Sequence, residues 1–154
     1  MFQSAGETHA IDAALQTRAA RNFSMISHVH VGVTDFERAF AFYSGVMDAL
    51  DYPLKFCERD RPWAGWMPTT AARPLFLIGP PHDGGIATPG KGQMVALLAP
   101  SQAAVDACYN AALAGGGRDD GPPGPRPHYH PHYYGAYFRD PDGNKICVCC
   151  HDPA

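Results

Sequence analysis

The stretch YGAYFRDPDGNKICV at residues 134–148 is the clearest structural signal in this sequence of 154 residues. Its centre, Asp-Pro-Asp-Gly-Asn at 140–144, has the composition of a turn. Proline presets φ at the second turn position, aspartate side chains bond to nearby backbone amides, and glycine accepts positive φ. The residues on both sides are rich in aromatic and β-branched types, which favour strands. The stretch therefore predicts a β-hairpin.

A strand followed by a helix is predicted upstream, beginning at residues 27–33, SHVHVGV. The residues alternate strictly, so the valines share one face of the strand, and His28 and His30 lie on the other. Asp35 then has the position and side chain of a helix N-cap. The apolar residues after it, up to Leu50, recur at the spacing of an amphipathic helix. Three strands are predicted to follow, at residues 54–58, 62–67 and 73–78.

The same order of elements restarts after residue 92. A strand at 93–99 leads into a helix that is capped by Ser101 and ended by the glycines at 115–117. The offset is 66 residues both from His28 to Met94 and from Asp35 to Ser101, which indicates an internal duplication. A weak strand near residue 118 and a loop at 121–131 are predicted to precede the hairpin.

Two motifs in these repeats resemble those of the vicinal oxygen chelate superfamily, which includes glyoxalase I, bleomycin-resistance proteins and extradiol dioxygenases. They are His28-x-x-x-x-Val33-x-Asp35 in the first strand and Asp140-Pro-Asp-Gly-x-x-Ile146-Cys147 in the hairpin. The resemblance covers residues 25–150. It implies an α+β fold in which two βαβββ modules form a curved mixed sheet with the helices on its convex side.

The domain organisation follows from the same comparison. We expect residues 1–24 to be an N-terminal extension that forms a short helix, because their composition is alanine-rich and unlike the rest. Residues 25–154 are expected to be a single domain. Its modules lie at 25–78 and 92–151, and a linker rich in glycine and proline joins them at 79–91.

The resemblance also implies where a metal would bind. In metal-using members the ligands face the cup of the sheet, at positions that correspond here to His28, Met94, Cys147 and a point within residues 75–77. Only His28 keeps a usual ligand, so it is the predicted metal ligand, while the cofactor is unknown and a divalent metal stays open. The set of His28, Met94 and Cys147 would suit a soft metal. The alternative is that methionine and cysteine fill the cup as apolar side chains.

A histidine-rich segment, PHYHPHYY at residues 127–134, is the second candidate site. Its histidines alternate, but Pro131 breaks a regular ladder, so we expect a loop over the mouth of the cup. Histidine titrates near neutrality and can act as a general acid or base, so His128 and His130 are the predicted catalytic residues. A metal site in this loop is the alternative. The residues predicted to contact the substrate are His30, Trp63, Tyr133 and Cys147.

Composition restricts the class of partner. A formal net charge of -3 gives no large basic field, so we expect no nucleic-acid partner. The sequence has no apolar run of membrane-spanning length, and its five cysteines form no disulfide pattern, so we expect a cytoplasmic protein without a membrane partner. Open sheet edges favour a homodimer.

The sequence thus predicts a glyoxalase-like protein that binds a small organic molecule in a cupped sheet, as a lyase or an isomerase. The alternative is a ligand-sequestering protein of the bleomycin-resistance type, without metal or catalysis. Whether the protein is an enzyme stays open, because most of the expected metal ligands are replaced.

Overall fold

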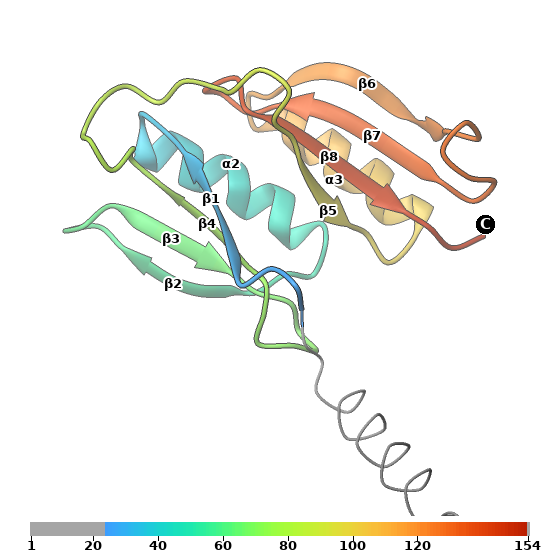
Figure 1. Ribbon diagram of the computed structural model, residues 1–154, viewed down its shortest axis with the longest axis horizontal. Coiled ribbons are helices and arrows are strands. Elements are labelled where there is room, and N and C mark those ends of the chain that lie inside the picture. Colours follow the sequence, from blue (N-terminus) through green and yellow to red (C-terminus); the bar gives the residue numbers. More distant parts are fainter. Residues whose placement is uncertain (1–23, 154) are drawn as a thin grey trace, which may run out of the picture.

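Two βαβββ modules make up residues 24–153, the part of the chain that the computed structural model describes (Figure 1). The first module consists of β1 (His28–Gly32), α2 (Phe36–Asp48), β2 (Leu54–Glu58), β3 (Trp63–Trp66) and β4 (Leu75–Gly79). The second consists of β5 (Val95–Leu98), α3 (Gln102–Ala114), β6 (Arg118–Pro125), β7 (Tyr134–Arg139) and β8 (Lys145–Cys150).

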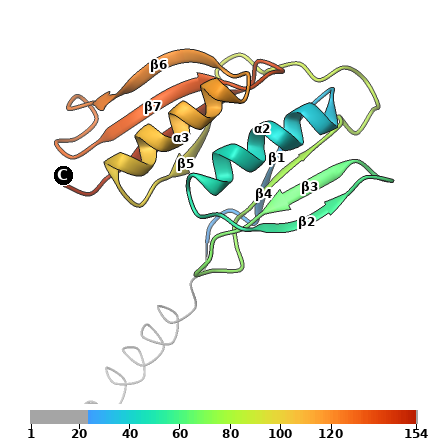
Figure 2. The same cartoon turned by 180° about the vertical axis from the view of Figure 1, so that it is seen from behind.

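Each module forms a four-stranded mixed sheet, and the strand orders β1-β4-β3-β2 and β5-β8-β7-β6 are equivalent. In both sheets the first strand pairs in parallel with the last strand of its module, and the other pairs are antiparallel. The helices lie behind both sheets in Figure 1 and in front of them in Figure 2, so they cover the same side. The predicted α+β fold of paired modules is confirmed, with the sheet divided into two halves.

The one clear difference from the predicted elements is β6. Residues 121–125 were expected in a loop, but they continue the strand and pair with β7 as far as Pro125 opposite Tyr134. Strand β6 is the outer strand of its sheet, so a proline that faces away from β7 costs no ladder hydrogen bond. The register shifts between Asp119, Gly121 and Gly124 accommodate the extra residues.

Both predicted helix caps are confirmed. The carboxylate of Asp35 accepts a hydrogen bond from the backbone N–H of Arg38 at 3.0 Å, and the hydroxyl of Ser101 accepts one from Ala104 at 3.2 Å. The two helices pack on each other and on the sheets, which produces a single core shared by both modules. The ring of Phe42 in α2 lies 6.1 Å from that of Phe138 in β7.

The predicted turn at 140–144 forms, and its first carboxylate is at the centre of a buried network. Asp140 is only 1% exposed. It accepts hydrogen bonds from the backbone N–H groups of Asp142 and Asn144, at 3.0 and 2.8 Å, and from the side-chain amide of Asn144 at 2.8 Å. The hydroxyl of Tyr43, on α2 of the other module, donates to it at 2.7 Å. A buried carboxylate is tolerated when several donors satisfy it in this way.

The same turn makes further bonds to the first module. The side-chain amide of Asn144 donates to the carbonyl of Gly32 at 3.0 Å, and the backbone N–H of Thr34 donates to the carboxylate of Asp142 at 3.0 Å. Arg38 lies 3.7 Å from that carboxylate. We call residues 140–144 the clasp, because they join the end of β1 and the start of α2 to the hairpin of the second module.

The structure does not test the predicted N-terminal helix or the predicted module boundaries. The helix predicted within residues 1–24 falls outside the described residues, apart from Ser24, and the module boundaries stay predictions. Within residues 24–153, neither helix has the length and apolar character needed to cross a membrane.

The clasp yields a stability prediction. Tyr43→Phe removes the hydroxyl that donates to Asp140 but keeps the packed ring. Because burial and the nearby carboxylate raise the pKa of Tyr43, the phenol is a protonated donor at neutral pH. We expect the variant to lose about 1.5–3 kcal/mol of unfolding free energy in urea denaturation, the range for a hydrogen bond to a charged group.

Tyr52→Phe is the matched control, since its hydroxyl donates to the neutral carbonyl of Leu98 at 2.7 Å in a more exposed place. We expect this variant to lose about 0.5–1.5 kcal/mol. Equal losses in the two variants would show that the buried carboxylate has no special role.

Candidate functional site

In Figures 1 and 2 no helix covers the sides of the two sheets that face away from α2 and α3, and we call these sides the open faces. The side chains of β1 alternate, so its valines pack toward the core while His28 and His30 point to the open side. In β8 the same alternation buries Ile146 and Val148 against the helix and turns Cys147 the other way. The first open face is formed by His28, His30, Trp63, Leu75 and Leu77, and the second by Leu98, Tyr137, Lys145, Cys147 and Cys149.

Trp63 is the main aromatic side chain of the first open face. Its ring lies 4.5 Å from that of Phe56, and the guanidinium of Arg61 lies 4.8 Å above it. Trp66 points the opposite way and is 1% exposed in the core. Of the two tryptophans, only Trp63 therefore lies on the first open face.

His30 lies close to Trp63 because Gly79 has no side chain. A Cβ atom at Gly79 would lie 3.1 Å from Nε2 of His30 and 3.3 Å from Cβ of Trp63. Partial burial, together with the neighbouring His28, lowers the pKa of His30. His30 is therefore a neutral imidazole at physiological pH and presents one donor and one acceptor.

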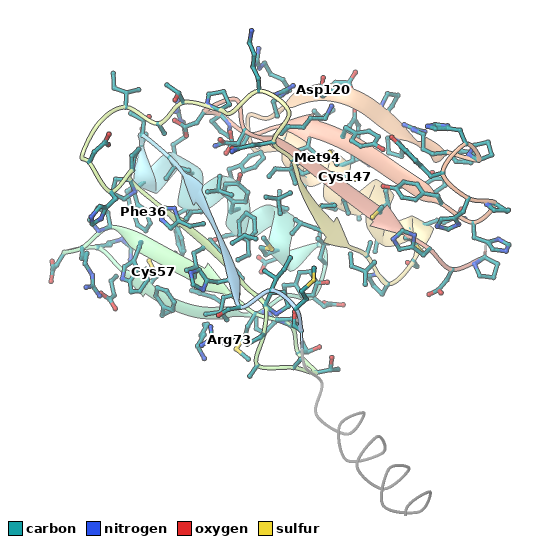
Figure 3. All side chains as sticks on the ribbon, in the orientation of Figure 1. Phe36, Cys57, Arg73, Met94, Asp120 and Cys147 are labelled. Atoms are coloured by element: carbon teal, nitrogen blue, oxygen red, sulfur yellow. The ribbon has the colours of Figure 1, made fainter. Side chains whose placement is uncertain are left out.

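The second open face combines an aromatic ring with two cations. The ring of Tyr137 has Nζ of Lys145 at 5.2 Å and the guanidinium of Arg126 at 5.6 Å. Tyr133 lies beside it, and its hydroxyl is 3.6 Å from the sulfur of Cys147. Figure 3 shows Cys147 on β8 and Met94 at the start of the neighbouring β5. Rings and cations placed in this way attract planar anionic molecules.

The two cations at the end of this face differ from Arg126 in their partners. Lys145 and Arg139 both pair with the carboxylate of Asp120, at 3.1 and 3.0 Å. The hydrogen bond and charge of Lys145, with a smaller effect of Arg139, lower the pKa of Asp120. Within residues 24–153, Arg126 donates only to the backbone carbonyls of Pro122 and Pro125. No carboxylate pairs with Arg126 among the ion pairs of residues 24–153.

The histidine-rich segment is a loop, as predicted, and it lies beside the second open face. Nε2 of His130 is 2.8 Å from Nδ1 of His151, and the backbone N–H of His132 donates to Nδ1 of His130 at 3.2 Å. His128 is exposed, and its ring packs on that of Tyr129 at 4.3 Å. The two predicted catalytic histidines therefore have different partners. Their catalytic roles stay predictions.

A small cavity connects the two modules. It has a volume of about 140 Å³. Its lining includes His30 from β1, Met94 at the start of β5 and Lys145 from β8, beneath the linker residues Thr88 and Pro89. Residues of both open faces thus reach one space, although no strand pairing joins the two sheets of the described chain.

The residues present do not form the metal site that the resemblance implies. His28 is on the first sheet, where its Nδ1 lies 3.2 Å from the hydroxyl of Ser27, and Cys147 is on the second. Leu75 and Leu77 offer no ligand atom. Within residues 24–153, no three His, Cys, Asp or Glu side chains are grouped so that they could hold a metal ion. This donor set does not fit a divalent metal, and His28 as a ligand stays a prediction.

Comparison with known proteins establishes the family. The profile of the Glyoxalase/Bleomycin resistance protein/Dioxygenase superfamily matches residues 25–148, and the chain belongs to this superfamily. A crystal structure of a glyoxalase/bleomycin resistance protein from Albidiferax ferrireducens is 35% identical, with a TM-score of 0.74, and the match covers 82% of this chain and 99% of that one. The predicted superfamily is thereby confirmed.

More distant structures share the fold. A glyoxalase-related enzyme from Fulvimarina pelagi is 18% identical over 83% of this chain and 88% of that one, with a TM-score of 0.61. TnmS3, an antibiotic binding protein from a Streptomyces species, is 22% identical over 85% and 98%, with a TM-score of 0.55. No protein with a curated description matches the chain in sequence.

Three side chains of this site were missed in the sequence. Arg126 lies in a stretch dense in proline and glycine. Such a composition predicts a loop and gives no sign that the arginine side chain has a defined position. Tyr137 was assigned only to a strand. His151 follows the last strand, and its spacing of two from Cys149 was the available sign that both face the same side.

The ion pairs of Asp120 yield a pH prediction. A lowered pKa in the folded state means that the pairs stabilise the fold above about pH 4, and that this is lost as the pH falls through the lowered pKa. The side chain of Asp120 is 31% exposed, so solvent weakens the pairs. We expect Asp120→Asn to be less stable than wild type by up to about 1 kcal/mol at pH 7.

Thermal unfolding at two pH values checks this, since the difference should vanish below about pH 3. Asp60→Asn, at an exposed carboxylate between β2 and β3, is the control and should show no difference at either pH. A loss of stability in Asp120→Asn that is as large in acid as at neutral pH would contradict the ion-pair explanation.

Proposed function

We propose that this protein binds a small planar organic anion, such as an aromatic carboxylate, on the second open face. One observation carries the proposal. Arg126 is a half-buried cation that lies over the ring of Tyr137 and has no carboxylate partner in residues 24–153. A guanidinium has five N–H donors in one plane, and the backbone carbonyls of Pro122 and Pro125 use only some of them.

The surroundings of Arg126 support a flat ligand. Tyr129 and Tyr133 lie with their rings 4.9 Å apart next to the histidine loop, and Tyr137 continues the aromatic surface on β7. Lys145 adds a second cation, 5.2 Å from the centre of the Tyr137 ring. Aromatic side chains bind planar ligands by stacking, and a few polar groups fix their orientation.

Binding is favoured over glyoxalase-type catalysis by the donor set. A lyase or isomerase of that type polarises a carbonyl with a divalent metal and moves a proton with a carboxylate. Of the corresponding positions, only His28 holds a usual metal ligand, and Leu75, Leu77, Met94 and Cys147 fit neither role. The proposal therefore follows the bleomycin-resistance type of superfamily member, in which a ligand is bound without a metal.

Calorimetric titration with 2-naphthoate, a planar aromatic carboxylate, tests the proposal. We expect saturable binding that Arg126→Met weakens about tenfold, which corresponds to about 1.4 kcal/mol for the lost ionic contact. Arg61→Met is the matched control, because Arg61 also lies over an aromatic ring but belongs to the first open face. Absent binding, or equal weakening by both variants, would refute the proposed site.

We also propose that the protein is a cytoplasmic homodimer. All five cysteines are free thiols, which supports a reducing compartment. Strand β5 is an outer strand, and its Leu98 is 56% exposed, while the nearby Met94 is 45% exposed. An apolar edge of this kind is commonly covered by a second subunit.

Light scattering during size-exclusion chromatography measures the oligomeric state. We expect a dimer at micromolar concentration that Leu98→Glu converts to a monomer, since the introduced charge would be buried. Leu113→Glu, at an exposed leucine of α3 on the other side, should leave the dimer intact. A monomeric wild-type protein would contradict the proposal.

A further inference from the structure

A chain of hydrogen bonds at the edge of the second open face ends on a thiol. Cys149 of β8 has its sulfur 3.8 Å from Nε2 of His151. The other nitrogen of His151, Nδ1, lies 2.8 Å from Nε2 of His130. His130 in turn has its Nδ1 3.2 Å from the backbone N–H of His132. Four groups from the loop, the strand and the chain end thus form a continuous relay.

The direction of this relay follows from its first member. A backbone N–H can only donate, so Nδ1 of His130 is an acceptor, and the proton of a neutral His130 is on Nε2. That proton is donated to Nδ1 of His151, which places the proton of a neutral His151 on its own Nε2. The relay therefore points an N–H group at the sulfur of Cys149. A donor in this position stabilises the thiolate over the thiol.

The other side chains around Cys149 add to this effect. The titratable groups that face it are Cys147 on the same strand, Tyr133 directly before β7, His151 and His130 of the relay, and Tyr52 from the loop before β2. Cys147 foremost, then Tyr133 and His151, act as donors and lower the pKa of Cys149 to about 6, although burial opposes them. Burial without such donors raises the pKa of Cys108 to about 12.

Access distinguishes Cys149 from its neighbour. Cys147 is 0% exposed, whereas Cys149 keeps 5% of its surface exposed beside the histidine loop. The tyrosine ring of Tyr133 lies edge-on to His151 at 5.2 Å, so the relay is held between the loop and the sheet. Of the two thiols on this face, Cys149 is therefore the less deeply buried one.

We propose that Cys149 is a nucleophile that captures a small electrophile, of the class of α,β-unsaturated carbonyl compounds, at the edge of the second open face. The thiolate sulfur forms a bond to the β-carbon, and the π-bond of the alkene breaks. Its electron pair gives an enolate, which takes up one proton from solvent, so a stable thioether results. His130 and His151 are positioning residues, because they act through the sulfur. The inference goes beyond the reversible binding proposed above.

Labelling of the full-length protein with N-ethylmaleimide, an α,β-unsaturated imide, tests the inference. Mass spectrometry of peptides gives the rate at each cysteine as a function of pH. We expect Cys149 to react at least about tenfold faster than Cys57 at neutral pH, with a midpoint of its rate near its pKa of about 6. Cys57 is a suitable reference, because it is partly exposed and outside the relay.

The variants test the relay. We expect His151→Gln to move the midpoint of the Cys149 rate up by about one pH unit, which slows labelling about fivefold at pH 6. His130→Gln should act in the same direction, while His128→Gln, in the same loop but outside the relay, should leave the profile unchanged. Three results would overturn the inference. They are labelling of Cys149 no faster than that of Cys57, preferred labelling of Cys147, or a midpoint of the Cys149 rate that is the same in His151→Gln as in wild type. N-ethylmaleimide has neither an aromatic ring nor a carboxylate, so this result is independent of 2-naphthoate binding.

Discussion

The rest of the structure depends on the hydrogen bonds that the buried carboxylate of Asp140 accepts. Its hydrogen-bond donors are two backbone N–H groups of the clasp, the side-chain amide of Asn144 and the hydroxyl of Tyr43. The carboxylate therefore connects a turn of the second module to a helix of the first. Removing one donor from a buried charge is costly, which makes the arrangement specific. Strand β8 begins at Lys145, directly after the clasp, so the clasp also fixes where the second open face lies relative to the first module.

From that point the site follows from strand geometry. A strand turns successive side chains to opposite sides, so β8 supplies Ile146 and Val148 to the core and Cys147 and Cys149 to the open face. The internal duplication gives the first module the same plan, but β4, the strand equivalent to β8, carries Leu75 and Leu77 instead of thiols, and β1 carries His28 and His30. The two faces therefore have different chemistry on one repeated scaffold. This is consistent with a superfamily in which fold is shared while function depends on the side chains placed on it.

Local features of the fold were predictable from sequence, and contacts between distant segments were not. The hairpin, both helix caps and the inward or outward direction of His28, Trp63 and Cys147 depend on neighbours within a few residues, where turn chemistry and alternation apply. Asp140 was recognised as a turn residue, yet its bond to Tyr43, 97 residues away, has no local signature. His151 and Arg126 were missed for the same reason, because a tail and a proline-rich edge strand acquire their partners only in the folded chain.

Amide chemical-shift mapping by NMR, with 2-naphthoate added to isotope-labelled protein, tests the location of the site most directly. The account predicts that the largest shifts fall on β7, β8 and the loop around Arg126, with smaller changes on α2, α3 and β2. Shifts confined to the first open face, or spread evenly over both sheets, would contradict it.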